Sequence, residues 1–200
     1  MKKLIFLAAF LFFAPAADAG LSGLGFGVHG GVIFGYDNPI LEQSILTDPQ
    51  FTGFDLAGTM YDVGGHVNIG TFRIIEFDAN LDYAWKKQEL APGIDLTYSD
   101  FSVTAAVRKS ISLGVIKPYL GVGGGVHVNA FSLDIGGQTV GVVLPDNETK
   151  TGYLFKGGVE LNIPLFPLTP YGEWRYNVIQ TTGKSTKYSS IIFGLTLDLP

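Results

Sequence analysis

Apolar residues alternate with small or polar residues along most of the chain after residue 20. In the clearest stretch, Ile75 to Trp85, every odd position is apolar or aromatic, whereas positions 76, 78, 80 and 82 are Glu, Asp, Asn and Asp. Strict alternation is typical of a β-strand whose two faces meet different surroundings. The same period recurs in segments 24–36, 57–69, 75–85, 101–108, 119–129, 153–163, 171–178 and 190–199. The pattern therefore predicts an all-β fold with eight strands.

The connections between these segments differ in length. Those at 70–73, 109–115 and 164–168 are short, those at 37–56 and 130–150 are long, and those at 86–93 and 180–186 are intermediate. Short turns alternating with longer loops are typical of an up-and-down barrel of the outer-membrane kind, which spans with strands of about 9–11 residues. We predict an eight-stranded antiparallel up-and-down transmembrane β-barrel.

One segment departs from the pattern. From Phe101 onward the apolar residues of this segment have odd numbers, whereas upstream the apolar residues Leu96 and Tyr98 have even numbers. This change of parity suggests either a β-bulge near Ser99 or the start of a solvent-exposed extension. Aromatic residues gather on the apolar parity near the loop ends of the strands, as in the aromatic girdle of a membrane interface. The predicted girdle comprises Phe34, Tyr36, Tyr61, Tyr83, Trp85, Phe101 and Tyr153.

The two faces could be exchanged, because a soluble eight-stranded barrel also alternates, with its apolar face inside. Here the polar parity is unusually rich in Gly, which a narrow lumen needs beside large side chains such as Tyr119, Tyr171 and Tyr188. It also carries both signs of charge, so buried ions could pair there. These features favour the membrane interpretation, with the apolar parity facing lipid.

Composition narrows the setting. The chain has 200 residues with 27 Gly, no Cys and 16% charged residues, against about 25% charged in ordinary soluble domains. Lys2 and Lys3, an apolar run and Ala17-Asp18-Ala19 predict a cleaved signal peptide over 1–19, followed by a single barrel domain over 20–200. Removing that segment changes the net charge from −5 to −6, which disfavours nucleic-acid binding.

Two stretches each begin a predicted strand directly after a short turn: IKPYLGVGGG at 116–125 and PYGEWRY at 170–176. Each has a Pro near the start of the strand, where Pro is tolerated in a sheet. With the strand pattern over the mature chain, they resemble the OmpA-type eight-stranded outer-membrane barrels. The resemblance implies location in the bacterial outer membrane, contact with lipid and lipopolysaccharide, and insertion by the barrel assembly machinery. It also implies a C-terminal aromatic residue, whereas this chain has Phe193 as its last aromatic.

Charged residues on the inward parity predict a lumenal network that plugs the barrel and fixes strand register. Pairing of the strands around the 86–93 connection would place Arg108 opposite Glu76. The network's functional alternative is a gate on a narrow pore. Its predicted members are Asp62, His66, Glu76, Asp78, Arg108, Lys156, Glu160, Glu173 and Arg175.

The histidines His29, His66 and His127 all have inward parity. With an acid such as Asp62 they could bind a divalent metal, and the turn at 70–73 would bring His66 near Glu76 or Asp78. No metal-ligand spacing motif supports this, so the expectation is hydrogen-bonded lumenal histidines with no metal or cofactor.

Three functions remain open. The first is a structural or adhesive surface barrel with a filled lumen, whose loops (apolar at 40–54 and 140–144) meet a ligand. The second is a conduit for small hydrophobic or ionic solutes. The third is a lipid A hydrolase, but His127-Val128-Asn129 lacks the Ser of a His-x-Ser step and Ser132 has the opposite parity. We therefore expect no enzymatic activity.

Overall fold

The computed structural model describes residues 23–37, 58–72, 75–142, 149–164, 166–180 and 185–199. The predicted signal peptide lies outside these residues, as does the apolar cluster at 40–54. Within these residues, no helix is long and apolar enough to cross a membrane. The strands are β1 (Leu24–Asp37), β2 (Met60–Phe72), β3 (Ile75–Ala91), β4 (Ile94–Ser110), β5 (Ile116–Ile135), β6 (Gln138–Val142), β7 (Thr149–Leu161), β8 (Leu168–Gln180) and β9 (Ser185–Leu199).

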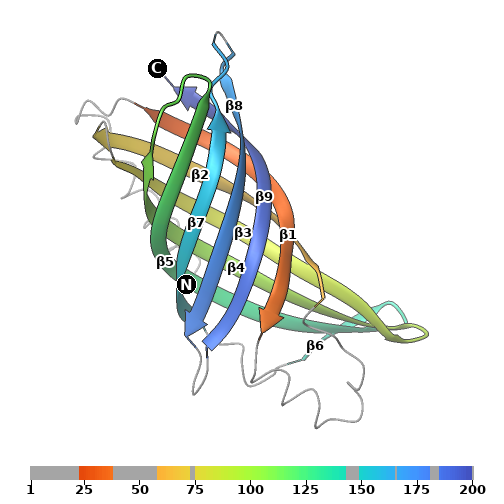
Figure 1. The fold of residues 1–200 in the computed structure, drawn as a ribbon. Helices are drawn as coiled ribbons and strands as arrows, with labels where there is room; N and C mark the ends of the chain where they lie inside the picture. The colour runs from red at the N-terminus through yellow and green to blue at the C-terminus, as the bar shows by residue number, and fades with distance from the viewer. Residues whose placement is uncertain are drawn as a thin grey trace, which may run out of the picture.

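Eight of these strands form a closed ring, and every pairing is antiparallel (Figure 1). Each strand pairs with the next in order from β1 to β5, then β5 with β7, β7 with β8, β8 with β9, and β9 with β1. β6 adds only to the far end of β5. The predicted eight-stranded up-and-down barrel is confirmed. We call the end with the short connections after β2, β4 and β7 the turn end, and the other the loop end.

At the loop end, β3, β4, β5 and β6 project beyond the rest of the wall (Figure 1). Two predicted loops are wrong here. Residues 86–93 belong to a tight hairpin, in which β3 runs to Ala91 and Gly93 turns the chain at φ 77°. Residues 130–142 of the predicted long loop are the end of β5 and all of β6, joined through Gly136 and Gly137. Alternation fades toward the tips of these strands, which lie beyond the other strands of the barrel wall (Figure 1).

The predicted bulge near Ser99 is also wrong. β4 keeps one register with β3 from Glu89 to Glu76, and Leu96 and Tyr98 simply point into the lumen. The parity change instead lies in β1, whose register with β9 shifts between Phe34 and Asp37 where Gly35 has φ 63°. This bulge turns Tyr36 inward, so Tyr36 is 1% exposed and is not a girdle residue.

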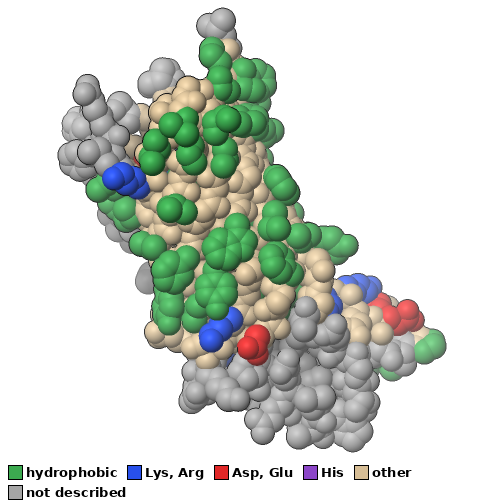
Figure 2. All heavy atoms as spheres, in the orientation of Figure 1, with side chains coloured by type: hydrophobic (Ala, Val, Ile, Leu, Met, Phe, Trp, Pro, Cys, Tyr) green, Lys and Arg blue, Asp and Glu red, His purple; other side chains and the backbone are tan. Residues whose placement is uncertain are grey.

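The outer wall of the barrel is apolar. Hydrophobic side chains cover the face shown in Figure 2, and the charged side chains visible there lie toward the ends of the barrel. Leu120, Phe193 and Val28 are 74%, 68% and 67% exposed. The remaining predicted girdle residues Phe34, Tyr61, Tyr83, Phe101 and Tyr153 also point outward, and Trp85 stacks on Tyr83. The faces therefore have the order predicted for a membrane barrel, apolar outside and polar inside.

Candidate functional site

The lumen is filled by large polar side chains that lie over glycines of neighbouring strands. A Cβ atom at Gly27 would lie 2.2 Å from the His66 ring, and one at Gly64 would lie 2.5 Å from His29 Nε2. Tyr119 lies over Gly158 in the same way, and Tyr171 lies over Gly194. The inward glycines thus provide the room that an eight-stranded barrel otherwise lacks.

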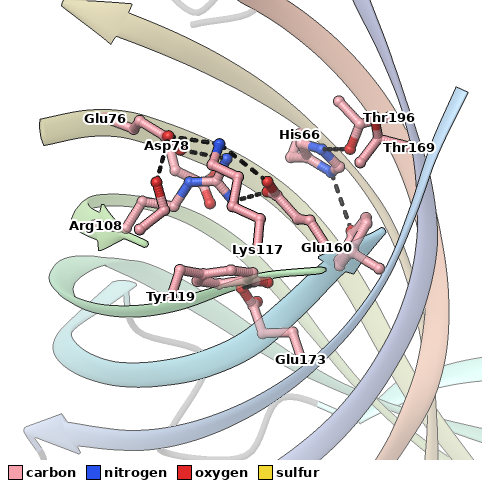
Figure 3. A network of polar contacts seen from close by, with 12 residues as sticks. His66, Glu76, Asp78, Arg108, Lys117, Tyr119, Glu160, Thr169, Glu173 and Thr196 are labelled. Carbon is pink, nitrogen blue, oxygen red and sulfur yellow. Dashed lines mark hydrogen bonds and ion pairs between the residues drawn. The ribbon is translucent and has the colours of Figure 1, made fainter. Parts of the chain in front are cut away.

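Arg108 is the centre of an ion cluster at the turn end (Figure 3). Its Nη2 forms an ion pair with Glu76 Oε2 at 2.6 Å, and its Nη1 forms one with Glu160 Oε1 at 2.5 Å. Lys117 Nζ bridges the same two carboxylates at 2.7 and 3.2 Å, and the Tyr119 ring lies beneath the guanidinium. β3 and β4 place Arg108 directly opposite Glu76, as the sequence predicted for these two residues.

A second ion cluster lies one layer farther into the barrel. Lys156 Nζ contacts Asp78 Oδ2 and lies 3.2 Å from Glu173 Oε2, which also accepts from the Tyr119 hydroxyl at 2.7 Å. Arg175 donates through Nε to Glu173 and through Nη1 to Asp82 at 3.0 Å. These contacts join β3, β5, β7 and β8 across the lumen, and they leave no room for a water molecule among the described side chains around it.

Two of the nine predicted network residues stand apart from these ion pairs. His66 faces Asn80 in the register, and its ring nitrogens lie 2.9 Å from Thr196 Oγ1 and 3.1 Å from the Tyr171 hydroxyl (Figure 3). The predicted proximity of His66 to Glu76 is therefore wrong, whereas Asp78 is the next inward position of β3 and lines the same part of the lumen as His66. Asp62 is buried but lies nearer the loop end of the lumen, beside His29 and Asp82.

Asp62, Asp82 and Asp100 form an acidic middle layer with two histidines. His29 Nε2 lies 2.6 Å from Asp82 Oδ1, and His127 Nδ1 lies 3.2 Å from Asp100 Oδ2. The three carboxylates and Arg175 line a small cavity with about 20 Å³ of space for a water-sized molecule. A single water needs about 10–15 Å³, so this cavity holds one small ligand at most.

The loop end of the lumen is closed by a tyrosine plug. Tyr36 stacks on Tyr188 with ring centroids 5.5 Å apart, and its hydroxyl contacts that of Tyr98. Four apolar side chains on the inward parity near this end are also buried: Ile33, Met60, Leu96 and Ile179. The plug combines a packed apolar cluster with hydroxyl groups that bond to one another.

Sequence reasoning missed four charged residues of the lumen. Lys117 shares the parity of Tyr119, and Asp82 shares that of Glu76, so a stricter use of parity finds both. Asp100 was hidden because its upstream neighbours of the same parity, Leu96 and Tyr98, are apolar. Lys150 was assigned to the long connection, whereas it lies in β7 and is buried. None of the four belongs to a recognisable motif, so face assignment is the only signal for them.

Solved structures resemble this chain at low sequence identity. Neisserial surface protein A has a TM-score of 0.57 and 17% identity, over 88% of this chain and 97% of its own. Ail, the attachment invasion locus protein of Yersinia pestis, has a TM-score of 0.56 and 13% identity, over 90% and 99%. The chain has the fold of the small outer-membrane β-barrels. A second Ail structure, in complex with the heparin analogue sucrose octasulfate, has a TM-score of 0.55 and 14% identity, over 90% of this chain and 100% of its own.

No protein-family model matches the chain, and no curated protein matches it. The resemblance thus lies in strand number, closure and length rather than in conserved sequence. This agrees with a barrel whose wall tolerates many apolar side chains in each outward position, as long as the alternation is kept.

Proposed function

We propose that this protein is an integral outer-membrane barrel with a structural or adhesive role at the cell surface. The observation that carries the proposal is the combination of a closed ring, an apolar outer wall and a filled, ion-paired lumen. Apolar wall residues suit lipid, and ring closure leaves no unpaired strand edge within the bilayer. The turn end would face the periplasm and the loop end the exterior.

The filled lumen argues against a conduit. The two ion clusters close the turn end, the tyrosine plug closes the loop end, and the cavity between them is about 20 Å³. A conducting path would have to break buried charge pairs at one end and move packed rings at the other. We therefore expect no stable single-channel conductance in planar bilayers.

Burial also argues against a lipid hydrolase. His127 contacts Asp100 and lies opposite Ser102 in the register, which brings Ser, His and Asp together. All three are buried: His127 is 2% exposed, Asp100 is 3% exposed and Ser102 is 5% exposed. An acyl chain in the membrane therefore has no path to them. Ser132 lies on the outward parity of β5, away from His127. Lipid A from cells with and without the gene should have the same mass profile.

Surface contacts would come from the projecting loop end. The segment 37–56 contains four acidic residues and no Lys, Arg or His, and it has two apolar runs. Such a segment suits a cationic or apolar partner better than a polyanion, because like charges repel at close range. We therefore propose an adhesive ligand unlike the heparin analogue bound by Ail.

The first experiment compares unboiled and boiled membrane fractions by gel mobility in SDS. A folded barrel resists SDS, so we expect a heat-dependent shift in the outer-membrane fraction. Absence of the shift, with the protein soluble in the periplasm, would overturn the membrane proposal. Binding of cells to cationic and to sulfated surfaces, with and without residues 38–56, then tests adhesion. We expect the deletion to reduce binding to the cationic surface only.

A further inference from the structure

We propose that His29, Asp62 and Asp82 bind a divalent transition-metal ion of the Zn²⁺ or Mn²⁺ class inside the barrel. One ligand atom of each residue lies within 4.8 Å of the others, although the three residues come from three strands, β1, β2 and β3. All three side chains are buried, at 6%, 4% and 7% exposure. The ion would be structural, bound in the acidic middle layer between the ion clusters and the tyrosine plug.

One ligand atom has no other partner: Asp62 Oδ1 is buried and makes no hydrogen bond. His29 and Asp82 already face each other, with Nε2 2.6 Å from Oδ1. A neutral His29 with its proton on Nδ1 presents the Nε2 lone pair, which is the form that binds a metal. Zinc lies about 2.0–2.2 Å from nitrogen and carboxylate ligands, so an ion that replaces the His29–Asp82 hydrogen bond needs Nε2 and Oδ1 to separate by less than about 1 Å and Asp62 to move inward.

Charge balance supports a cation at this level. Around the two ion clusters, four carboxylates (Glu76, Asp78, Glu160 and Glu173) face four cations (Arg108, Lys117, Lys156 and Arg175). The middle layer has three carboxylates, Asp62, Asp82 and Asp100, and it shares Arg175, already counted above, with the ion clusters. Among the described residues at that level, only Lys150 adds a further fixed positive charge. Two negative charges remain, and one divalent ion neutralises them.

A separate observation points to a ligand in the cavity beside Asp62 and Asp82. Thr104 Oγ1 lines this cavity, is buried and has no partner, and Asp100 Oδ1 is in the same state. Unpaired buried acceptors are costly unless water or an ion satisfies them. The cavity has room for one metal-bound water, which the hydroxyl of Thr104 and the carboxylate of Asp100 could hold.

The mixture of donors selects the ion. One imidazole and two carboxylates suit Zn²⁺ or Mn²⁺ better than Mg²⁺ or Ca²⁺, which prefer oxygen ligands alone. Three protein ligands and one water complete a tetrahedral zinc site. Arg175 Nη1, 3.0 Å from Asp82 Oδ1, opposes the ion, so we expect micromolar rather than picomolar affinity.

The test uses protein without a histidine tag, refolded from urea into detergent micelles with and without Zn²⁺, because the closed lumen would slow entry afterwards. After gel filtration, metal analysis should give one zinc per chain, and zinc should raise the midpoint of urea unfolding. When Mn²⁺ replaces Zn²⁺ in the refolding, the electron paramagnetic resonance spectrum of the bound Mn²⁺ should be broader than that of the free ion. Failure of the heat-dependent gel shift would instead count against the barrel itself.

Three variants separate ligation from mere charge. Asp62→Asn should weaken zinc binding at least tenfold, since it removes a ligand oxygen and a charge. Asp100→Asn, in the same cavity but outside the ligand set, should weaken it less than threefold. Asp95→Asn, in the β3–β4 hairpin, should have no effect. Equal losses in Asp62→Asn and Asp100→Asn would overturn the proposal. Wild-type protein that keeps far less than one zinc per chain after gel filtration would overturn it too. If Asp62→Asn fails to fold, an unchanged wild-type unfolding midpoint with Zn²⁺ overturns it equally.

Discussion

At its turn end the lumen is closed by ion pairs around Arg108, whereas at its loop end it is closed by the packed rings of Tyr36, Tyr98 and Tyr188. Arg108 and the three tyrosines are all buried, but the energetics of the two closures differ. Breaking a buried ion pair leaves an uncompensated charge. Shortening a packed ring leaves a cavity that neighbours can partly fill. The turn end should therefore tolerate substitution less well than the loop end.

The most damaging single change should be Arg108→Ala. It leaves Glu160 and Glu76 short of a charge partner in a buried site, which costs about 3–5 kcal/mol of unfolding free energy. Urea unfolding in micelles measures the loss. Adding Glu160→Gln to this variant should recover part of it, because a neutral amide replaces the unpaired carboxylate. No recovery would mean that Arg108 acts by packing on Tyr119 rather than by charge.

At the loop end, Tyr98→Ala should cost about 3 kcal/mol, at the low end for an aromatic truncation, because buried apolar neighbours can relax into the space. Conductance gives a sharper comparison. We expect Tyr98→Ala and Arg108→Ala to remain closed singly and to conduct only when combined, since each end seals the lumen by itself. Conduction in Tyr98→Ala alone would show that the ion clusters do not seal.

Outside the lumen, Val103→Arg should cost about 2–4 kcal/mol in lipid vesicles, because β4 carries Val103 outward near its middle, at the depth where charge meets hydrocarbon. Leu113→Arg, in the β4–β5 connection, is the matched control and should cost less than about 1 kcal/mol. Equal effects at the two sites would contradict the membrane orientation. In detergent both effects should shrink.

A smaller loss should follow Gly158→Ala. The new Cβ would lie 2.5 Å from the Tyr119 hydroxyl and 2.6 Å from Gly172 O, so ring and backbone must both move, at about 1–3 kcal/mol. Gly30→Ala is the control, since its Cβ would meet its nearest atom at 3.6 Å. Urea midpoints of the two variants should differ clearly. Identical midpoints would show that Tyr119 has room to shift.

The smallest effect should come from the exposed ion pair in the β3–β4 hairpin, Lys87 Nζ to Asp95 Oδ2 at 2.7 Å. The hydrogen bond to Asp95 raises the pKa of Lys87, so its contribution is complete below the ordinary lysine pKa of about 10.4 and is lost only as pH rises beyond it. Lys87→Gln should leave the unfolding midpoint unchanged from about pH 6 to about pH 9. A measurable change would mean that the hairpin packs on another part of the protein.

Parity explains which parts of this fold could be predicted. A period of two assigns faces without any tertiary information, so the strands, the inward histidines and the Arg108–Glu76 pair all follow from it. It fails where a strand leaves the barrel, as in β3 to β6, and where a bulge inserts a residue, as at Gly35. Tyr36 was misplaced because of that bulge. Tyr98 was misplaced because an apolar residue was expected on the outer face, although β4 keeps one register and its parity places Tyr98 inside.

The sequence alone determined the class of fold, the number of strands and the polarity of the two faces, because each depends on local alternation and on connection length. The tertiary structure decided which residues meet. Asp82 joins His29, Asp62 and Arg175 only because four strands bring them to one depth of a closed ring. That depth depends on the stagger between strands, which no single segment encodes. The sealed lumen and the acidic middle layer are thus properties of closure rather than of any one strand.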